Sequence, residues 1–386
     1  MEKKFNILFV DDDERILNSF KRLLRDNENI KYYFSNSAEQ ALEILKEKAI
    51  DIIISDMKMP YMDGSSFLSY VHLHYPGIIR IILSGYSEEE VVVKSFKYAH
   101  QFIAKPLSAN KINELILQLI KYEKYLSNDA VRNVINSISY LPTIPSLYAE
   151  IEKEILSENF SIRNIAEKIA KDISISTKLL QIVNSAYYGV ARNIIDPKVA
   201  VNLIGIEVVK SVVLMSGIFQ KKYKNPKIEK FLEKLWEHSF KVASIAKSLA
   251  EIDTKDNKTL DEVFAIGILH DIGILVMLDL NFYIEMIGDM FNNETDLIEK
   301  ENYTYKTNHS VIGAYLLNLW GFPMKVIDVI ENHHTNRITN DIYLDAIILA
   351  NDLELKKNKV LVIDKIYQRY KDKSKVDNLL TEFGYI

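Results

Sequence analysis

The chain has 386 residues, of which 48% are hydrophobic and 26% charged, and it carries a formal net charge of −5. This length suits about two or three globular domains, and the composition argues against collagen, long disorder and a basic protein dedicated to binding nucleic acid. Because there is no cysteine, the sequence excludes disulfides, a cysteine nucleophile and iron–sulfur clusters, so any metal must be bound by His, Asp or Glu.

The first 126 residues alternate short apolar runs with amphipathic stretches. Runs rich in β-branched residues predict strands at residues 5–10, 51–55, 78–84 and 101–105, and a weaker strand at 31–34. Apolar residues with helical spacing lie between these runs and again over residues 110–126. This alternation predicts an α/β domain with a doubly wound, five-stranded parallel sheet of flavodoxin-like type.

From residue 127 onward the strand pattern fades, and almost every segment has the helical period. We therefore predict an α/β domain at residues 1–126, a linker or continued helix at 127–140, and an all-α domain with a helical tail at 141–386. The longest apolar stretch, residues 264–278, is interrupted by His270 and Asp271, and the N-terminal apolar run is too short for a signal peptide. These features predict a cytoplasmic protein without a membrane segment.

Polar side chains follow the predicted strands of the α/β domain. Asp11 and Asp12 come directly after the first strand, Asp56 ends the third, and Ser84 and Lys105 end the next two. In an open α/β sheet these strand ends share one edge, where ligands bind. Three carboxylates at one point require a hard cation such as Mg²⁺, which would also neutralise a phosphoryl group on one of them. A lysine and a serine hydroxyl can bind phosphoryl oxygens at the same edge.

Four segments of this domain, "ILFVDDDERIL", "IIISDMKMPYMDG", "IILSGYS" and "FIAKPL", resemble the signature motifs of the response-regulator receiver domain of two-component systems. The resemblance implies that Asp56 is the acceptor of a phosphoryl group from a histidine kinase. It also implies that Asp11 and Asp12 hold Mg²⁺ together with Asp56. In the same family pattern Lys105 contacts the phosphoryl group, and Ser84 is the switch hydroxyl.

Two features of the α/β domain depart from this pattern or match none of it. Phe102 occupies the aromatic switch position, where tyrosine is frequent, and this argues against a switch that needs a ring hydroxyl. His72, His74 and His100 match no motif, and we expect them to be ordinary surface or boundary histidines.

The other five histidines lie in the helical half, on or beside apolar helix faces. His270 and Asp271 interrupt an apolar helix, where an unpaired charge would be costly. Neutral imidazoles and carboxylates suit Fe, Mn, Zn or Ni, and a carboxylate can bridge two ions that activate water for attack on phosphorus. The candidate metal ligands are His238, His270, Asp271, His309, His333, His334 and Asp352.

This half carries a second resemblance. The segments "ILHDIG", "NHSVIGAYLLNLWGFP" and "ENHH" resemble the HD superfamily of metal-dependent phosphohydrolases. The segments "LPTIPSLYAEI", "LLQIVNSAYYG" and "AVNLIGIEVVKSVVL" narrow the resemblance to the HDOD branch, the HD-related output domains. Many HDOD domains lack the metal ligands and are regarded as noncatalytic signalling modules, whereas the resemblance implies that this chain retains the HD pattern. Asp345 is a rival to Asp352 for the last ligand position.

The sequence leaves the output function open. Ile274 follows "HDIG" where the related HD-GYP phosphodiesterases carry a lysine, and no GYP segment follows His334. Glu301, at a position where Glu is frequent in these families, is interpreted as a helix-surface acid rather than an extra ligand. The favoured hypothesis is a module that binds an unknown partner protein or a second copy of the chain. The alternatives are a metal-dependent phosphohydrolase or cyclic-nucleotide phosphodiesterase, and a structural metal without turnover.

Overall fold

The computed structural model describes residues 5–24, 30–84, 98–105, 128–137, 146–157, 160–183, 194–219, 226–280, 282–287, 295–335, 337–355 and 359–386, together with 115, 119, 121, 122 and 125. The chain divides into two compact units, Met1–Ser146 with Tyr315–Phe322, and Leu147–Ala314 with Pro323–Ile386. Most of the helix predicted over residues 110–126 lies outside the described residues.

The first unit contains a five-stranded sheet in the order β2-β1-β3-β4-β5, in which all pairs are parallel. The strands are β1 (Phe5–Val10), β2 (Ile30–Ser35), β3 (Ile52–Asp56), β4 (Ile79–Ser84) and β5 (Gln101–Ala104). This is the flavodoxin-like order of doubly wound folds, so the predicted fold of this unit is confirmed. β1, β3 and β4 are almost entirely buried, which explains why they appear in the sequence as continuous apolar runs.

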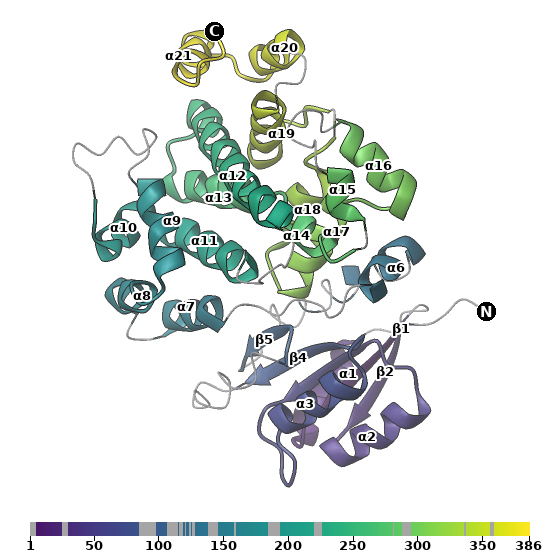
Figure 1. Ribbon diagram of the computed structural model, residues 1–386. Helices are drawn as coiled ribbons and strands as arrows, with labels where there is room; N and C mark the ends of the chain where they lie inside the picture. The colour runs from purple at the N-terminus through teal and green to yellow at the C-terminus, as the bar shows by residue number, and fades with distance from the viewer. Residues whose placement is uncertain are drawn as a thin grey trace. The chain divides into compact units, whose positions relative to one another are not determined.

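Helices cover both faces of this sheet (Figure 1). They are α1 (Glu14–Leu23), α2 (Ala38–Glu47) and α3 (Gly64–His74). On one face, Leu8, Ile53 and Ile82 of the sheet share a hydrophobic core with buried side chains of α2 and α3. On the other face the ring of Phe9 lies 4.6 Å from that of Phe20 in α1. Because side chains alternate along a strand, the two faces of β1 bury different helices.

An arginine is buried at the other end of the sheet from the acidic residues. Arg80 of β4 is 1% exposed, and its guanidinium donates hydrogen bonds to the carbonyls of Tyr98 and Ile78 at 2.5 and 2.6 Å. Its Nη2 lies 3.1 Å from Nε2 of His100 and 3.3 Å from Nδ1 of His72. His100 is fully buried, so the expectation that it is a surface or boundary histidine was wrong.

This cluster predicts a loss of stability in acid. Burial and the neighbouring Arg80 hold the pKa of His100 well below its ordinary value, and they also lower the pKa of His72. At these two histidines the unfolded chain therefore binds protons near pH 6.5, whereas the folded protein does not. Their contribution to the free energy of unfolding is fully present above that pH and is lost as the pH falls through it. The free energy of unfolding of the wild type should therefore decrease between about pH 7 and pH 5. In His100→Gln this decrease should be smaller by up to about 2 kcal/mol.

Urea unfolding of the full chain at both pH values measures this effect. His74→Gln is the matched control, because His74 is an exposed histidine on α3 whose ring stacks on Tyr70. Equal pH dependence in wild type and His100→Gln would show that the buried cluster does not sense acid.

From residue 128 onward the described residues form helices and no strand, as predicted for the second half. The longest helix, α12, has 28 residues and packs against α13 and α19. Among the described residues, no helix combines the length and apolar character needed to cross a bilayer. The helices are α6 (Asp129–Ser137), α7 (Ser146–Leu156), α8 (Ile162–Ile169), α9 (Ile173–Val183), α10 (Pro197–Ile204), α11 (Ile206–Phe219), α12 (Pro226–Asp253), α13 (Asn257–Leu269), α14 (Ile272–Met277), α15 (Tyr283–Ile287), α16 (Thr295–Tyr305), α17 (His309–Leu319), α18 (Met324–Asn332), α19 (Ile342–Glu354), α20 (Lys359–Arg369) and α21 (Lys373–Glu382).

Candidate functional site

Three carboxylates meet at the carboxyl edge of the sheet. Asp11 and Asp12 follow β1, Asp56 ends β3, and each offers an oxygen within 4.8 Å of the others. Asp11 and Asp56 are buried, whereas Asp12 is exposed. Nζ of Lys105, directly after β5, donates to Oδ2 of Asp11 at 2.8 Å and to Oδ1 of Asp56 at 2.5 Å. The predicted acids and the lysine therefore lie together, with one carboxylate open to solvent.

The loop after β3 holds Asp56 in place. The backbone N–H of Lys58 donates to Oδ2 of Asp56 at 3.2 Å, and that of Gly64 donates to the carbonyl of Met57 at 2.8 Å. A Cβ atom on Gly64 would lie 2.1 Å from the carbonyl oxygen of Asp56, so only glycine allows this close approach. Glycine at this position therefore lets α3 begin directly beside the candidate phospho-acceptor.

The charge balance of this edge suits a hard cation. Burial raises the pKa of Asp11, although the Lys105 ammonium opposes that shift. The two carboxylates raise the pKa of Lys105 against the opposite effect of its own burial. The three carboxylates offer oxygen donors of the kind that Mg²⁺ prefers. Ser84 ends β4 and Phe102 lies in β5, but the side chains of both residues are outside the described part of the chain.

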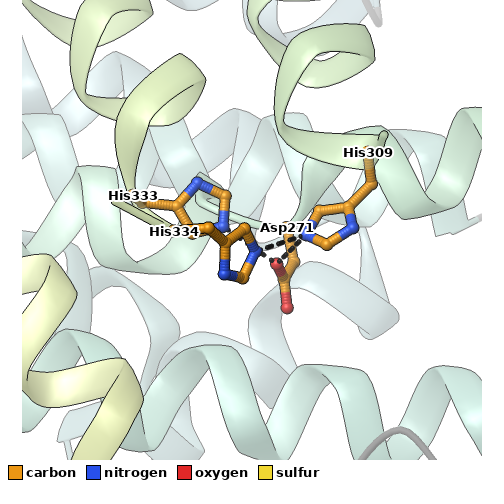
Figure 2. Close-up of side chains that lie close together, drawn as sticks. All are labelled: Asp271, His309, His333 and His334. Carbon is orange, nitrogen blue, oxygen red and sulfur yellow. Dashed lines mark hydrogen bonds and ion pairs between the residues drawn. The ribbon is translucent and has the colours of Figure 1, made fainter. Parts of the chain in front are cut away.

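The second site lies in the helical unit, around the buried Asp271, and Figure 2 shows Asp271 beside His309, His333 and His334. His238 lies within α12, and His270 and Asp271 form the junction between α13 and α14. His309 begins α17, and His333 and His334 follow α18. His334 is partly exposed, whereas the other five side chains are at most 2% exposed. Six of the seven predicted ligands therefore gather in one buried cluster.

Asp271 divides this cluster into two halves. Its Oδ2 lies 3.4 Å from Nε2 of His238 and 3.2 Å from Nε2 of His270, and we call these groups the His238 half. Its Oδ1 lies 3.3 Å from Nε2 of His309 and 3.5 Å from Nε2 of His333. With His334, whose Nε2 lies 2.8 Å from Nε2 of His309, these groups form the His309 half. Each half could hold one metal ion, and Asp271 would contribute one oxygen to each.

The outer nitrogens of four rings already have acceptors. Nδ1 of His238 lies 2.5 Å from Oε2 of Glu354, and Nδ1 of His309 lies 2.9 Å from Oε2 of Glu301. Nδ1 of His270 and of His333 lie 2.7 Å from the carbonyl oxygens three residues earlier in the chain. With a hydrogen on each Nδ1, these contacts are satisfied and the Nε2 lone pairs would be free to bind a metal, as in histidines that bind metals.

A bound cation would offer the buried acceptor atoms of this cluster the positive partner that they need. Both carboxylate oxygens of Asp271 and Nε2 of His333 are buried and make no hydrogen bond among the described residues. Buried acceptors without donors are costly, and divalent transition metals accept this nitrogen and oxygen donor set. The residues therefore fit two metal ions that share the Asp271 carboxylate.

Close helix approaches bring the halves together. A Cβ atom on Gly273 would lie 1.9 Å from the carbonyl oxygen of His309, so α14 touches the start of α17. A Cβ atom on Gly267 would lie 2.5 Å from Cα of Ala243, so α13 lies against α12. These contacts set the separation of His309 from Asp271 and of His238 from His270.

The seventh predicted ligand and its rival lie elsewhere. Asp352 is nearly buried in α19 but is not among the groups whose ligand atoms meet at Asp271. Asp345 accepts hydrogen bonds from the backbone N–H groups of Thr339 and Asn340 at 2.8 Å and from Nε of Arg369 at 2.6 Å. Asp345 therefore anchors the turn before α19, and a metal would compete with these donors.

Two acids near the cluster were not recognised as part of the site from the sequence. Glu301 is fully buried and contacts His309, so its interpretation as a helix-surface acid was wrong. Glu354 was overlooked, although it lies two residues after the predicted ligand Asp352 and ends α19. The available signal for both was an acidic residue on a helix expected to pack beside a histidine.

Comparisons with known proteins agree with both domains. A family model described as "Response regulator receiver domain" matches residues 7–117, and one described as "HDOD domain" matches residues 141–336. The combination of a receiver domain and an HDOD domain supports the conclusion that the protein is a response regulator. Within that class, the chain belongs to the HDOD domain family.

Individual relatives match only parts of the chain. An uncharacterized protein of Treponema pallidum (strain Nichols) is 25% identical over 210 residues, which are 52% of this chain and 39% of that protein. Hydrogenase transcriptional regulatory protein HoxA of Cupriavidus necator is 29% identical over 122 residues, 31% of this chain and 25% of that protein. The chain thus spans well under two thirds of the length of these relatives.

The helical fold also occurs in a solved structure. An HDOD domain protein with unknown function from Geobacter sulfurreducens has a TM-score of 0.51 and 19% sequence identity. The alignment covers 67% of this chain and 94% of that one. At this identity the likeness concerns the fold alone.

Proposed function

We propose that the chain is a phosphorylation-dependent response regulator in which Asp56 accepts a phosphoryl group from a histidine kinase. The supporting observation is the meeting of Asp11, Asp12 and Asp56 with Lys105 at one edge of the sheet. A Mg²⁺ ion held by the three carboxylates would neutralise charge on the transferred group. Lys105, which pairs with Asp56 at 2.5 Å, is placed to pair instead with phosphoryl oxygens.

Phosphorylation with acetyl phosphate and Mg²⁺ tests this proposal. Asp56→Asn should lose essentially all acid-stable labelling, because the amide has no nucleophilic carboxylate oxygen. Asp63→Asn is a suitable control, since Asp63 caps α3 in the same loop and accepts from the backbone N–H of Ser66. Equal labelling of Asp56→Asn and wild type would assign the acceptor elsewhere.

For the helical domain we propose a centre of two transition-metal ions. The observation that carries this proposal is the buried Asp271 carboxylate, which faces Nε2 atoms of four histidines without a hydrogen bond among the described residues. His238 and His270 would hold one ion, and His309, His333 and His334 the other. Fe, Mn, Zn and Ni all suit these donors.

The second candidate function is hydrolysis of a phosphate ester by this centre. When bound, two such ions supply the Lewis acidity that activates water and neutralises charge on phosphate. His334 is the most exposed of the six side chains of the cluster. A module that acts only by binding a partner protein needs a suitable surface, but it does not need a buried carboxylate among five histidines. The geometry therefore favours metal chemistry over an interaction-only module.

Protein purified without a histidine tag separates the three hypotheses for the output. Elemental analysis measures bound metal, and assays with cyclic dinucleotides and phosphomonoesters after Fe or Mn loading measure turnover. Metal with turnover supports the hydrolase, whereas metal without turnover assigns a structural centre. The absence of bound metal after loading would refute the metal proposal and return the interaction module to first place.

A further inference from the structure

In each half of the cluster, a glutamate carboxylate contacts the Nδ1 atom of one histidine. Glu354 contacts Nδ1 of His238 at 2.5 Å, and Glu301 contacts Nδ1 of His309 at 2.9 Å. Neither glutamate belongs to the groups whose ligand atoms meet at Asp271. They therefore act on the cluster through a histidine rather than by direct ligation.

Glu354 belongs to the His238 half. It is the last residue of α19, and its side chain is 15% exposed. Its second oxygen, Oε1, lies 3.6 Å from Nζ of Lys241, which is one helical turn after His238 on α12. The carboxylate thus joins the end of α19 to two residues of α12 and fixes the orientation of the His238 ring.

Glu301 belongs to the His309 half and is fully buried. Its Oε2 also accepts the backbone N–H of His309 at 3.1 Å, and its Oε1 accepts the hydroxyl of Tyr283 at 2.5 Å. Three donors from α15 and α17 therefore hold this carboxylate on α16. The ring of His309 cannot rotate without breaking a charge-assisted hydrogen bond in a dry environment.

Two of the other three rings in the cluster have a neutral acceptor in place of a carboxylate. His270 and His333 are held by the carbonyl oxygens of Gly267 and Ile330, which are neutral acceptors. Each half thus combines one histidine backed by a carboxylate with one backed by a carbonyl. A carboxylate acceptor makes an imidazole a stronger metal ligand than a carbonyl does, and loss of such a partner typically weakens metal binding about ten- to hundredfold.

We propose that Glu354 and Glu301 are positioning residues that separately set the metal affinity of the His238 half and the His309 half. The inference rests on the proposed metal centre. It assigns to each glutamate an effect on one half only, because the contacts given above for the two glutamates, all among described residues, have no residue in common.

The test uses the full chain with Glu354→Gln and Glu301→Gln, loaded with Mn²⁺ at a free concentration fixed by a chelator. Each variant should retain one ion where wild type retains two, with affinity at the lost half lowered about ten- to hundredfold. Double variants identify which half has lost its ion. Glu354→Gln with His270→Ala should still retain one ion, whereas Glu354→Gln with His333→Ala should retain none. The pattern should reverse for Glu301→Gln.

Glu262→Gln is the matched control, because Glu262 is 17% exposed, lies on α13 of the same unit and pairs with Lys325. It should leave both affinities unchanged. If Glu354→Gln and Glu301→Gln bind two ions with wild-type affinity, or each weakens both halves equally, the positioning proposal is overturned. Wild-type protein that binds no Mn²⁺ would instead overturn the metal centre itself, so the two failures are distinguishable.

Discussion

Asp271→Asn should abolish metal binding in both halves of the histidine cluster at once. One carboxylate oxygen faces His238 and His270, and the other faces His309 and His333. The amide removes the negative charge that both ions would share and turns one of the two oxygens into a donor group. Metal content per chain, measured by elemental analysis after loading and desalting, should fall from two ions to none.

His333→Ala provides the comparison for this variant. His333 contributes to the His309 half alone, so its loss should leave one ion bound in the His238 half. A circular dichroism spectrum unchanged from wild type ensures that either result reports on the site rather than on unfolding. If Asp271→Asn retains the same metal content as wild type, Asp271 does not bridge two ions.

Gly273→Ala should disrupt the fold around the same site. The added methyl group would lie 1.9 Å from the carbonyl oxygen of His309 and 2.6 Å from the backbone nitrogen of Gly313. These are backbone atoms, so α14 and α17 must separate, and overpacking of this kind costs about 1–3 kcal/mol or more. We expect a lower melting temperature together with weaker metal binding in the His309 half.

Gly77→Ala is the control for the glycine substitution, because among the described residues, apart from Gly77 and its two chain neighbours, no atom lies within 4 Å of a Cβ atom built on Gly77. Thermal melts followed by circular dichroism, with metal content measured on the same samples, compare the two variants. A melting temperature and a metal content equal to wild type for Gly273→Ala would show that the helices can move apart freely and that the contact does not position His309.

The α/β domain could be predicted from its sequence because its local signals and its tertiary fold agree. Strands buried on both faces form continuous apolar runs, and parallel strands place their carboxyl ends at one edge. Asp11, Asp56 and Lys105 therefore meet as expected. The sequence could not reveal that His100 is buried beside Arg80, since that contact joins β4 to the segment before β5 across a tertiary fold.

The histidine cluster was predictable as a set of residues, but its outer partners were not. Asp352 lies on α19 with the helical spacing of a core residue, yet Glu354, two positions later, is the acid that contacts His238. The choice depends on the rotation of α19 against α12, which side-chain periodicity does not fix. Glu301 lies in a polar stretch of α16, and its burial follows from pairing with His309 and Tyr283. For both glutamates, contacts with residues distant in the sequence determine where the side chain lies, and local polarity does not.

The most direct test of the proposed centre is the electron paramagnetic resonance spectrum of the Mn²⁺-loaded full chain. If one Asp271 carboxylate joins two ions, the spectrum should show a magnetically coupled Mn²⁺ pair, and Asp271→Asn should lose that signal. A spectrum of isolated Mn²⁺ ions only, or no bound Mn²⁺ at all, would contradict the central claim that the helical domain of this response regulator contains a shared two-metal centre.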